Sequence, residues 1–349
     1  GSDIYMLAGN YSRTAATNPQ GSGASEWVLL LVKGEVSGED DSNKKIQWNK
    51  SQRLTGTFPE GEQDSLMQLV GGGGSGVKME DGTLVFPVEG TKKRESENDG
   101  KTVSLLMYTS DDSSWKLSTG MSDGGCSDPS VVEWEKDKLM MMTACDDGRR
   151  RVYEIGDKGD SWTEALGTLS RVWGNKHKGH EKGIGSGFIT ATVGGDKKKV
   201  MLVTLPVYSK EKEDEDNEEK EKSELHLWLT DNTHIVDIGP VSEKGEDDVT
   251  ASSLLYESAV SGDSNQEEKL IALYEKKKKG DGESTHGLWS VRLSEQLQRV
   301  KDVVATWKKV DGIVSKLCPT QVLRRVPQLE MSAALLISRM GWLAFCPAN

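Results

Sequence analysis

The chain has 349 residues, of which 29% are charged and 35% hydrophobic, and its formal net charge is −12. This length allows one large all-β domain or two domains of average size. The negative charge argues against a nucleic-acid partner, because such partners bind basic surfaces. No apolar run reaches the roughly 18 residues that a transmembrane helix needs. The 38 glycines, and 10 tryptophans against 4 phenylalanines, are typical of a protein with many hairpins closed by turns.

Short apolar and β-branched runs predict strands in the first part of the chain, at residues 3–9, 27–36, 84–88 and 103–108. Five glycines and a serine at 71–76 predict either a flexible loop or a place where one backbone approaches another. A phosphate-binding loop is excluded there, because neither a Lys-Ser/Thr pair nor a helical pattern follows.

The middle of the chain predicts three strands joined by turns, at residues 131–134, 139–143 and 150–155. A tight turn follows, in which Asp157 can hydrogen-bond the backbone, Gly159 can take a positive φ and Trp162 can cover the hairpin. A similar turn, shorter by one residue, ends at Trp115, 47 positions before Trp162. A period of about 40–50 residues with several short strands per unit indicates propeller blades.

Further strands are predicted at residues 200–206, 225–229, 253–256, 270–274 and 288–291. The charged stretch between Ser209 and Ser223 predicts a solvated loop. After Arg292 the apolar spacing changes to three and four residues, which predicts an amphipathic helix over 293–310 with Ser294 at its N-terminus. Its apolar face comprises Leu293, Leu297, Val300, Val304, Trp307 and Val310.

The run Trp162-Thr163-Glu164-Ala165-Leu166-Gly167-Thr168-Leu169-Ser170-Arg171-Val172-Trp173-Gly174 resembles the trypanosomatid trans-sialidase and sialidase surface proteins. The turn before it is similar to the Asp box of sialidases, formed by Asp157, Gly159 and Trp162, with Ile155 where that motif has Ser. The resemblance implies an all-β fold, an incomplete six-bladed β-propeller over residues 1–292 followed by one connecting helix over 293–318. It also implies that the start of the propeller and a lectin-like domain are missing.

In that family an arginine triad clamps the sialic acid carboxylate, a Glu activates a Tyr nucleophile and an Asp is the acid/base. The resemblance places Glu133 at the activating Glu and Arg149 at the second clamp arginine. A solvated strand glutamate beside a tryptophan, and an exposed edge-strand cation, are the alternative interpretations of these two residues. The position of the third clamp arginine holds residues 221–224, without Arg, and the nucleophile position holds Ala251. The first clamp arginine and the acid/base are expected upstream of this chain.

We therefore expect a catalytically inactive, sialidase-like surface glycoprotein that binds host-cell glycans or host proteins and serves adhesion or immune evasion. The alternative is an active exo-sialidase or trans-sialidase. The resemblance implies a location at the cell surface or outside the cell, and no metal or other cofactor. Asn10 and Asn49 begin glycosylation sequons. The four cysteines show no metal-binding spacing, and their pairing cannot be deduced from the sequence.

Residues 319–349 match nothing expected of the family, so we expect a disordered, non-family tail. The run from Met340 to Pro347 contains Met, Trp and Cys codons that, shifted in frame, can encode a family-like Gly-Leu-Val-Gly-Phe-Leu-Ser run. A frameshift soon after Pro319 is therefore the favoured interpretation of the tail. A short helix around residues 333–337 is the structural alternative.

Overall fold

A computed structural model describes residues 3–10, 28–38, 44–54, 58, 66–93, 100–110, 114–174, 184–195, 197–211, 220–242, 248–258, 267–278 and 285–317. The chain divides into two units, Gly1–Leu297 and Gln298–Asn349. The described part of the first unit consists of strands, one short 3-10 turn and the beginning of a helix. The described part of the second unit is helical throughout.

The first two blades hold the strands of the N-terminal third. The first blade comprises β1 (Asp3–Asn10), β2 (Val28–Ser37), β3 (Lys45–Trp48) and β4 (Gln52–Arg53), in the order β1-β2-β3 with β4 also on β2. The second blade comprises β5 (Leu66–Gly71), β6 (Val77–Lys78), β7 (Leu84–Lys92), β8 (Thr102–Thr109) and β9 (Lys116–Leu117), in the order β5-β7-β8-β9 with β6 also on β7.

The remaining strands form three more blades. The third comprises β10 (Cys126–Glu135), β11 (Lys138–Cys145), β12 (Arg150–Gly156) and β13 (Ser161–Glu164), paired in chain order. The fourth comprises β14 (Phe188–Val193), β15 (Lys198–Glu211), β16 (Lys220–Thr230) and β17 (Ile235–Pro240). The fifth comprises β18 (Asp248–Glu257), β19 (Lys269–Lys278) and β20 (Thr285–Arg292), and a single parallel bridge between Ser223 and Asp248 joins it to the fourth.

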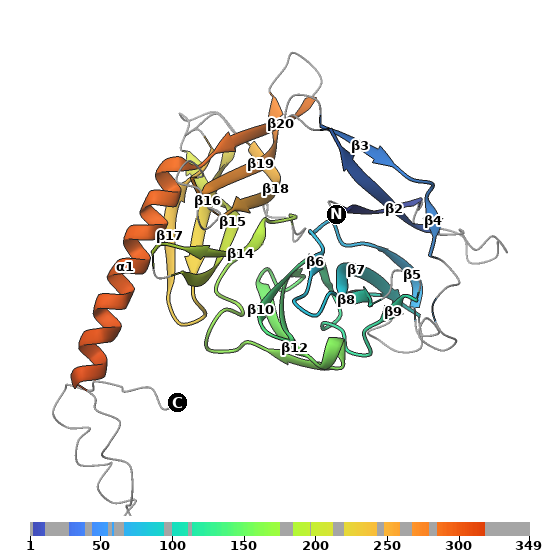
Figure 1. Cartoon of the computed structure of the whole chain (residues 1–349), viewed down its shortest axis with the longest axis horizontal. Helices are drawn as coiled ribbons and strands as arrows, with labels where there is room; N and C mark the ends of the chain where they lie inside the picture. The colour runs from blue at the N-terminus through green and yellow to red at the C-terminus, as the bar shows by residue number, and fades with distance from the viewer. Residues whose placement is uncertain are drawn as a thin grey trace, which may run out of the picture. The chain divides into compact units, whose positions relative to one another are not determined.

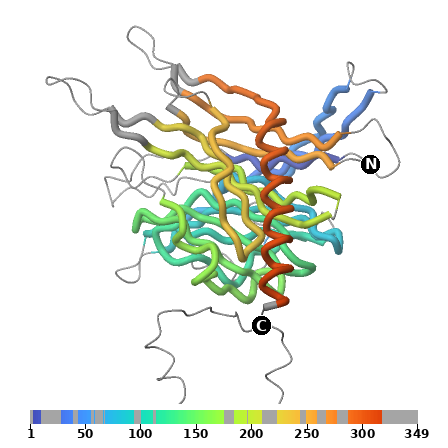
Figure 2. Tube along the Cα trace, turned by 90° about the vertical axis from the view of Figure 1, so that its left-hand side faces the viewer, coloured from blue at the N-terminus to red at the C-terminus, as the bar shows by residue number. Residues whose placement is uncertain are grey.

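Within the first unit the blades succeed one another around a common centre, from β1–β4 through β10–β13 to β18–β20 (Figure 1). The β15–β16 and β19–β20 hairpins run out on the same side of the unit (Figure 2). The predicted all-β propeller is therefore confirmed. The described residues supply five blades, so a ring of six remains a prediction.

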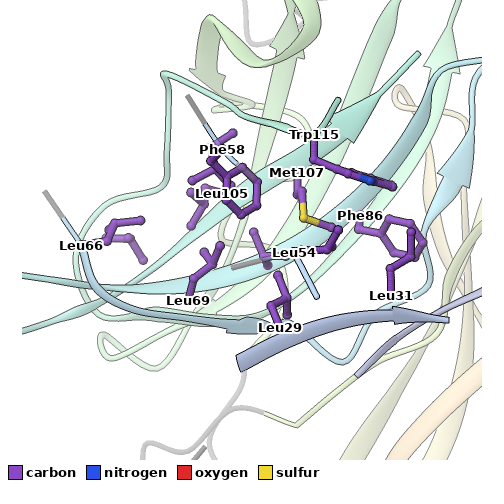
Figure 3. Close-up of a cluster of buried hydrophobic side chains, with 13 residues drawn as sticks. Leu29, Leu31, Leu54, Phe58, Leu66, Leu69, Phe86, Leu105, Met107 and Trp115 are labelled. Carbon is purple, nitrogen blue, oxygen red and sulfur yellow. The ribbon is translucent and has the colours of Figure 1, made fainter. Parts of the chain in front are cut away.

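Three apolar clusters fill the spaces between successive blades, because each blade is a sheet with apolar side chains on both faces. The cluster between the first and second blades contains Leu29, Leu31, Phe86, Met107 and Trp115 (Figure 3). Val131, Met141 and Tyr153 of the third blade pack against the second blade on one face. Val132, Met140 and Met142 pack towards the fourth blade on the other face.

Trp115 and Trp162 occupy corresponding places on successive blades. Trp115 directly precedes β9, and Trp162 is the second residue of β13, so each lies where the outermost strand begins. Trp115 is fully buried and packs 5.9 Å from Phe86. Trp162 packs 5.6 Å from Tyr153, and its Nε1–H donates to Gly159 O at 2.8 Å. In both blades, a tryptophan at the start of the outermost strand therefore packs with the apolar cluster between that blade and the preceding one.

The glycine run at 71–76 is a close approach of backbones. A Cβ at Gly74 would collide with the carbonyl oxygen of Pro129, and a Cβ at Gly72 would collide with the Pro129 ring. Pro129 lies on β10, so the glycines let the second blade approach the third directly. Of the two interpretations left open by the sequence, close approach is confirmed.

The strand predictions located the long strands but missed the short or polar ones, which are β3, β4, β5, β6, β9, β13, β14 and β17. The charged stretch after Ser209 was predicted to be a loop, and this is wrong at both ends. β15 continues to Glu211 and β16 begins at Lys220, with Glu211 opposite Lys220. Alternating charges are compatible with a strand in a hairpin that is solvated on both faces. Residues 212–219 lie outside the described residues.

The predicted helix is α1 (Ser294–Leu317), which ends seven residues beyond the apolar pattern. Leu293 and Leu297 are buried, and Leu297 N–H donates to Leu293 O at 2.9 Å. Farther along the helix, Val310, Ile313 and Val314 are exposed. Among the described residues, no helix is both long and apolar enough to span a membrane. The predicted tail, residues 319–349, lies outside the described residues, as does Cys318.

Candidate functional site

A disulfide closes one end of the third blade. Cys126, at the start of β10, lies directly opposite Cys145, at the end of β11, and their sulfur atoms are bonded at 2.05 Å. Both residues are buried. The sequence left the pairing open because the fold alone sets which strand ends meet.

Arg149 lies at this disulfide end of the blade. It is exposed in the turn between β11 and β12, and its carbonyl oxygen accepts a hydrogen bond from Cys145 N–H at 3.1 Å. Its backbone also bridges to Gly174, in the segment that follows β13. Arg149 is therefore anchored by its main chain, and its guanidinium is presented outward.

Arg149 lines a hollow of about 700 Å³ between the third and fourth blades, with Trp173, Tyr208 and Trp228 among the other lining residues. The two indole rings meet edge to face, 6.1 Å apart. A hollow of this size with aromatic walls and a few polar groups has the composition of a small-ligand site. The "Arg149 hollow" below means this site.

Glu133 lies at the opposite end of the third blade. It is only 8% exposed, and its Oε2 accepts a hydrogen bond from Glu80 N–H at 3.0 Å. Glu80 belongs to the turn between β6 and β7, so this bond joins the second and third blades. No described residue reaches Oε1, which is buried. A solvated glutamate does not fit this placement, because Glu133 is buried. A catalytic glutamate does not fit it either, because the carboxylate is held in a contact between two blades.

The structure does not bring Glu133 and Arg149 together. Arg149 is bonded to Cys145, which pairs with Cys126, and Glu133 lies seven residues farther along β10. At about 3.3 Å per residue, the two are roughly 20 Å apart along the strand. One sugar cannot touch both, so they do not form a single substrate site.

The other positions assigned by resemblance lie towards the Arg149 end. Ser223, within the segment where the third clamp arginine was expected, accepts a hydrogen bond from Val249 N–H at 2.8 Å. Ala251 is exposed on β18, two residues farther on. The side chains of Glu221 and Lys222 lie outside the described part. The segment between Ile184 and Gly187 links these strands to the third blade.

Two hydrogen bonds establish that link. Ser252 N–H donates to Gly185 O at 3.0 Å, and Arg150 Nη2 donates to Ile184 O at 2.8 Å. Ala251 therefore lies next to Ser252, which is bonded to Gly185, and the neighbouring Ile184 is bonded to Arg150. The end of the blades that carries Arg149 therefore also carries Ala251, the residue that the resemblance places at the nucleophile position.

Arg150 and Asp128 are the residues at this end that sequence reasoning passed over. Arg150 is 1% exposed, and burial lowers its pKa to about 10, although the charges of Asp128 and Tyr208 act in the opposite direction. Its Nε and Nη1 find no hydrogen-bond partner among the described residues. The sequence has three consecutive arginines and does not indicate which of them is buried. The alternation of side chains along β12 places Arg150 in the interior.

Asp128 lies beside Cys126 with a φ of +51°, and its N–H donates to Glu89 Oε1 at 2.7 Å. Ser127 Oγ donates to its Oδ2 at 2.9 Å. The disulfide end of the third blade therefore carries a fixed carboxylate that acts electrostatically on the buried guanidinium of Arg150.

The Asp-box turn lies at the far end of the third blade from Arg149. Asp157 and Gly159 form a 3-10 turn, closed by Asp160 N–H donating to Asp157 O at 3.3 Å. Gly159 has a φ of +105°, which only glycine adopts readily. Thr119 Oγ1 donates to Asp160 Oδ1 at 2.8 Å and ties the turn to the second blade. The turn is thus a structural clamp away from the Arg149 hollow.

The two sequons differ in what the structure describes. Asn49 follows β3, is exposed, and donates its backbone N–H to Lys33 O at 2.8 Å. Asn10 ends β1, and Tyr11 and Ser12 of its sequon lie outside the described residues. The Asn49 side chain is accessible to a glycan.

Comparison with known proteins agrees with this architecture. The model of the BNR repeat-like domain matches residues 1–275. A Trypanosoma cruzi sialidase is 34% identical over 353 aligned residues, covering 99% of this chain. The structure of Trypanosoma rangeli sialidase in complex with the inhibitor DANA superposes with a TM-score of 0.73, at 34% identity over 91% of this chain. The chain belongs to the sialidase and trans-sialidase superfamily.

Its relatives in this superfamily are considerably longer. The chain spans 28% of the T. cruzi sialidase and 39% of a second T. cruzi protein, sialidase 85-1.1, to which it is 33% identical. It covers 47% of the T. rangeli sialidase structure. The expected superfamily membership is confirmed, and the activity of the whole protein is a matter for proposal.

Proposed function

We propose that this chain is a sialidase-family binding protein without sialidase activity, which holds glycans at a host-facing surface. The observation that carries the proposal is Ala251, which stands at the family's nucleophile position and at the Arg149 end of the blades. A methyl group cannot form the covalent glycosyl intermediate. Loss of the nucleophile therefore removes the first chemical step of a retaining sialidase.

The carboxylate clamp is reduced as well. Ser223 and Glu224 stand within the segment of the third clamp arginine, and a carboxylate there repels the acid of a sialic acid. Each lost hydrogen bond between an arginine and a carboxylate costs about 1.5–3 kcal/mol of binding. Arg150 does not replace the missing group, because it is buried and already donates to Ile184 O.

Binding can persist where catalysis is lost. The Arg149 hollow retains an outward guanidinium, two indole rings and the Tyr208 ring. Aromatic faces and a cation suit a sugar that bears a carboxylate. Sialylated host glycans are therefore the proposed ligands, with roles in adhesion or immune evasion. Glu133 has no part in this site.

A six-bladed ring at a surface location is the proposed setting. On the fifth blade, Leu255, Leu273 and Leu288 are exposed on one face, as expected of a sheet face against which a further blade packs. Accessible Asn49 supports glycosylation in the secretory pathway.

Two assays on the purified chain test the proposal. We expect no release of fluorophore from a sialic acid fluorogenic glycoside above buffer and no transfer to lactose, with T. rangeli sialidase as the positive enzyme. We expect sialyllactose to bind, and Arg149→Ala to weaken that binding about tenfold or more, since a charged hydrogen bond is lost. Lys116→Ala, at an exposed cation of the second blade that lines neither hollow, is the matched control. Turnover above buffer overturns the claim of inactivity and favours the active sialidase, whereas binding unaffected by Arg149→Ala overturns the site.

A further inference from the structure

A second groove lies at the other end of the same two blades. It has a volume of about 320 Å³ and is lined on the third blade by Trp134, Glu154 and Thr163, and on the fourth blade by Asn232. These residues are close to the β12–β13 turn, at the end of the third blade that is remote from Arg149. The "Trp134 groove" below means this site.

Trp134 supplies an apolar surface held in a fixed position. Its half-buried indole packs against the cluster between the third and fourth blades. Lys199 of the fourth blade holds its Nζ 6.0 Å from the centre of the ring. The packing and the Lys199 ammonium hold the indole in place, so that little conformational entropy of this side chain is lost when a ligand binds in the groove.

Polar groups stand beside this ring on the same face of the blade. Glu154 lies directly opposite Thr163 across β12 and β13, so their side chains project side by side. Both side chains are exposed. Ser161 adds a hydroxyl at the next position of that face in β13.

Asn232 completes the groove from the fourth blade. Its φ is +72°, and its N–H donates to Thr230 Oγ1 at 3.0 Å, which fixes the backbone. Its Oδ1 is buried and accepts no hydrogen bond from a described residue. The side-chain amide can therefore rotate towards a ligand without losing a hydrogen bond at Oδ1. A hydroxyl group of the ligand would then donate to this oxygen.

We propose that the Trp134 groove binds an uncharged hexose unit of a glycan. An indole face beside a carboxylate, a hydroxyl and an amide matches the C–H face and the neighbouring hydroxyls of a pyranose ring. The charges oppose an ionic ligand of either sign. Glu135 is paired with Lys138 at 2.9 Å, Glu154 also acts electrostatically on Lys138, and the Lys199 ammonium lies over the Trp134 ring.

This groove is independent of the proposed function. It shares no lining residue with the Arg149 hollow and lies at the opposite end of the third blade. Binding of a neutral hexose here therefore survives if sialoside binding fails, and the reverse also holds. If both sites bind, the chain can hold two sugars of one branched or extended glycan.

Saturation-transfer NMR on the full chain tests the proposal, with methyl glycosides of galactose, glucose and mannose as probes and the methyl glycoside of sialic acid, which contains no neutral hexose, as the charged comparison. We expect at least one neutral hexoside to bind and the double change Glu154→Ala/Thr163→Val to weaken it about tenfold or more. Both side chains project to solvent, so the change leaves the fold intact. Glu35→Ala, at an exposed glutamate of the first blade that lines neither site, is expected to bind as the unchanged chain does.

A second readout does not depend on the folding of that variant. The indole N–H signal of Trp134, assigned through Trp134→Phe, is expected to shift as the bound hexoside is titrated. The proposal is overturned if no neutral hexoside binds, if binding survives the double change, or if the Trp134 signal stays in place while other signals move.

Discussion

Glu133 and Arg149 lie at opposite ends of the third blade, seven strand positions apart, although only fifteen residues separate them in the chain. Resemblance had assigned both to one sugar site. The geometry instead gives Arg149 an open hollow with aromatic walls and gives Glu133 a buried contact with the second blade. The two residues therefore predict different consequences when they are changed.

Glu133→Ala is expected to reduce stability without altering glycan binding. The change removes the acceptor of Glu80 N–H in a partly buried contact between two blades, and the loss of such a hydrogen bond costs about 1 kcal/mol of the free energy of unfolding. Glu133→Gln keeps an acceptor oxygen and is expected to cost less. Urea denaturation measures both, and sialyllactose binding is measured on the same samples. A loss of binding with unchanged stability would return Glu133 to the ligand site.

Removing the disulfide is expected to destabilise the Arg149 end of the third blade. Cys126 and Cys145 are 19 positions apart, and closing a loop of that length restricts the unfolded chain by about 3 kcal/mol. We expect Cys126→Ala/Cys145→Ala to lose stability of this order, with a matching loss in the unchanged chain under reducing agent. Equal urea midpoints for the oxidised and reduced chains would contradict the prediction.

Gly120 and Trp162 are expected to be coupled. A Cβ at Gly120 would collide with Cδ1 of Trp162, whose Nε1–H is fixed on Gly159 O. Gly120→Ala is therefore expected to cost about 1–3 kcal/mol of stability through overpacking. In a Trp162→Ala background the same change is expected to cost little, because the ring is gone. A double-mutant cycle by urea denaturation measures the coupling, and strictly additive losses would show that the ring moves aside freely.

The ion pair between Asp81 and Lys158 joins the second blade to the Asp-box turn, with Nζ 3.0 Å from Oδ2. Hydrogen bonds from Thr83, assisted by Lys158, lower the pKa of Asp81 from 3.8 to about 2. A pKa lowered by folding means that ionised Asp81 stabilises the fold above its unfolded pKa, and that this stability is lost as the pH falls through the folded pKa.

The unchanged chain is accordingly expected to be more stable than Asp81→Asn by about 1 kcal/mol at neutral pH, a small value because the pair is partly solvated. The difference is expected to shrink as the pH falls from about 4 towards 2. Free energies of unfolding measured at several pH values provide the check. A difference between the two proteins that does not depend on pH would show that the charge of Asp81 is not its cause.

The exposed leucines of the fifth blade are expected to drive self-association of this chain. Leu255, Leu273 and Leu288 share one face and are 62%, 43% and 73% exposed. A contiguous apolar face of this kind favours association. Changing Leu273 and Leu288 to Ser is expected to raise the monomer fraction in light scattering. Leu166→Ser, at an isolated exposed leucine of the third blade, is the control, and an equal effect there would show that the face has no special role.

The sequence determined the class of fold. Short apolar runs around residues 103–108 and 139–143, and two turn tryptophans 47 positions apart, predicted blades because the composition of a buried strand and the residues of a turn are local properties. The helix from Ser294 was predicted for the same reason, from apolar residues three and four apart. Short strands such as β9 and β13 were missed, since two to four residues carry too little pattern of their own and are fixed by pairing with a longer neighbour.

Tertiary structure alone decided the site. Cys126 pairs with Cys145, Arg150 is buried while Arg149 is exposed, and Ala251 shares an end of the blades with Arg149. None of these relations is local, because each depends on strand register and on how successive blades meet. Glu133 and Arg149 are close in the sequence. An extended strand advances by about 3.3 Å per residue, and so the two residues lie at opposite ends of the blade.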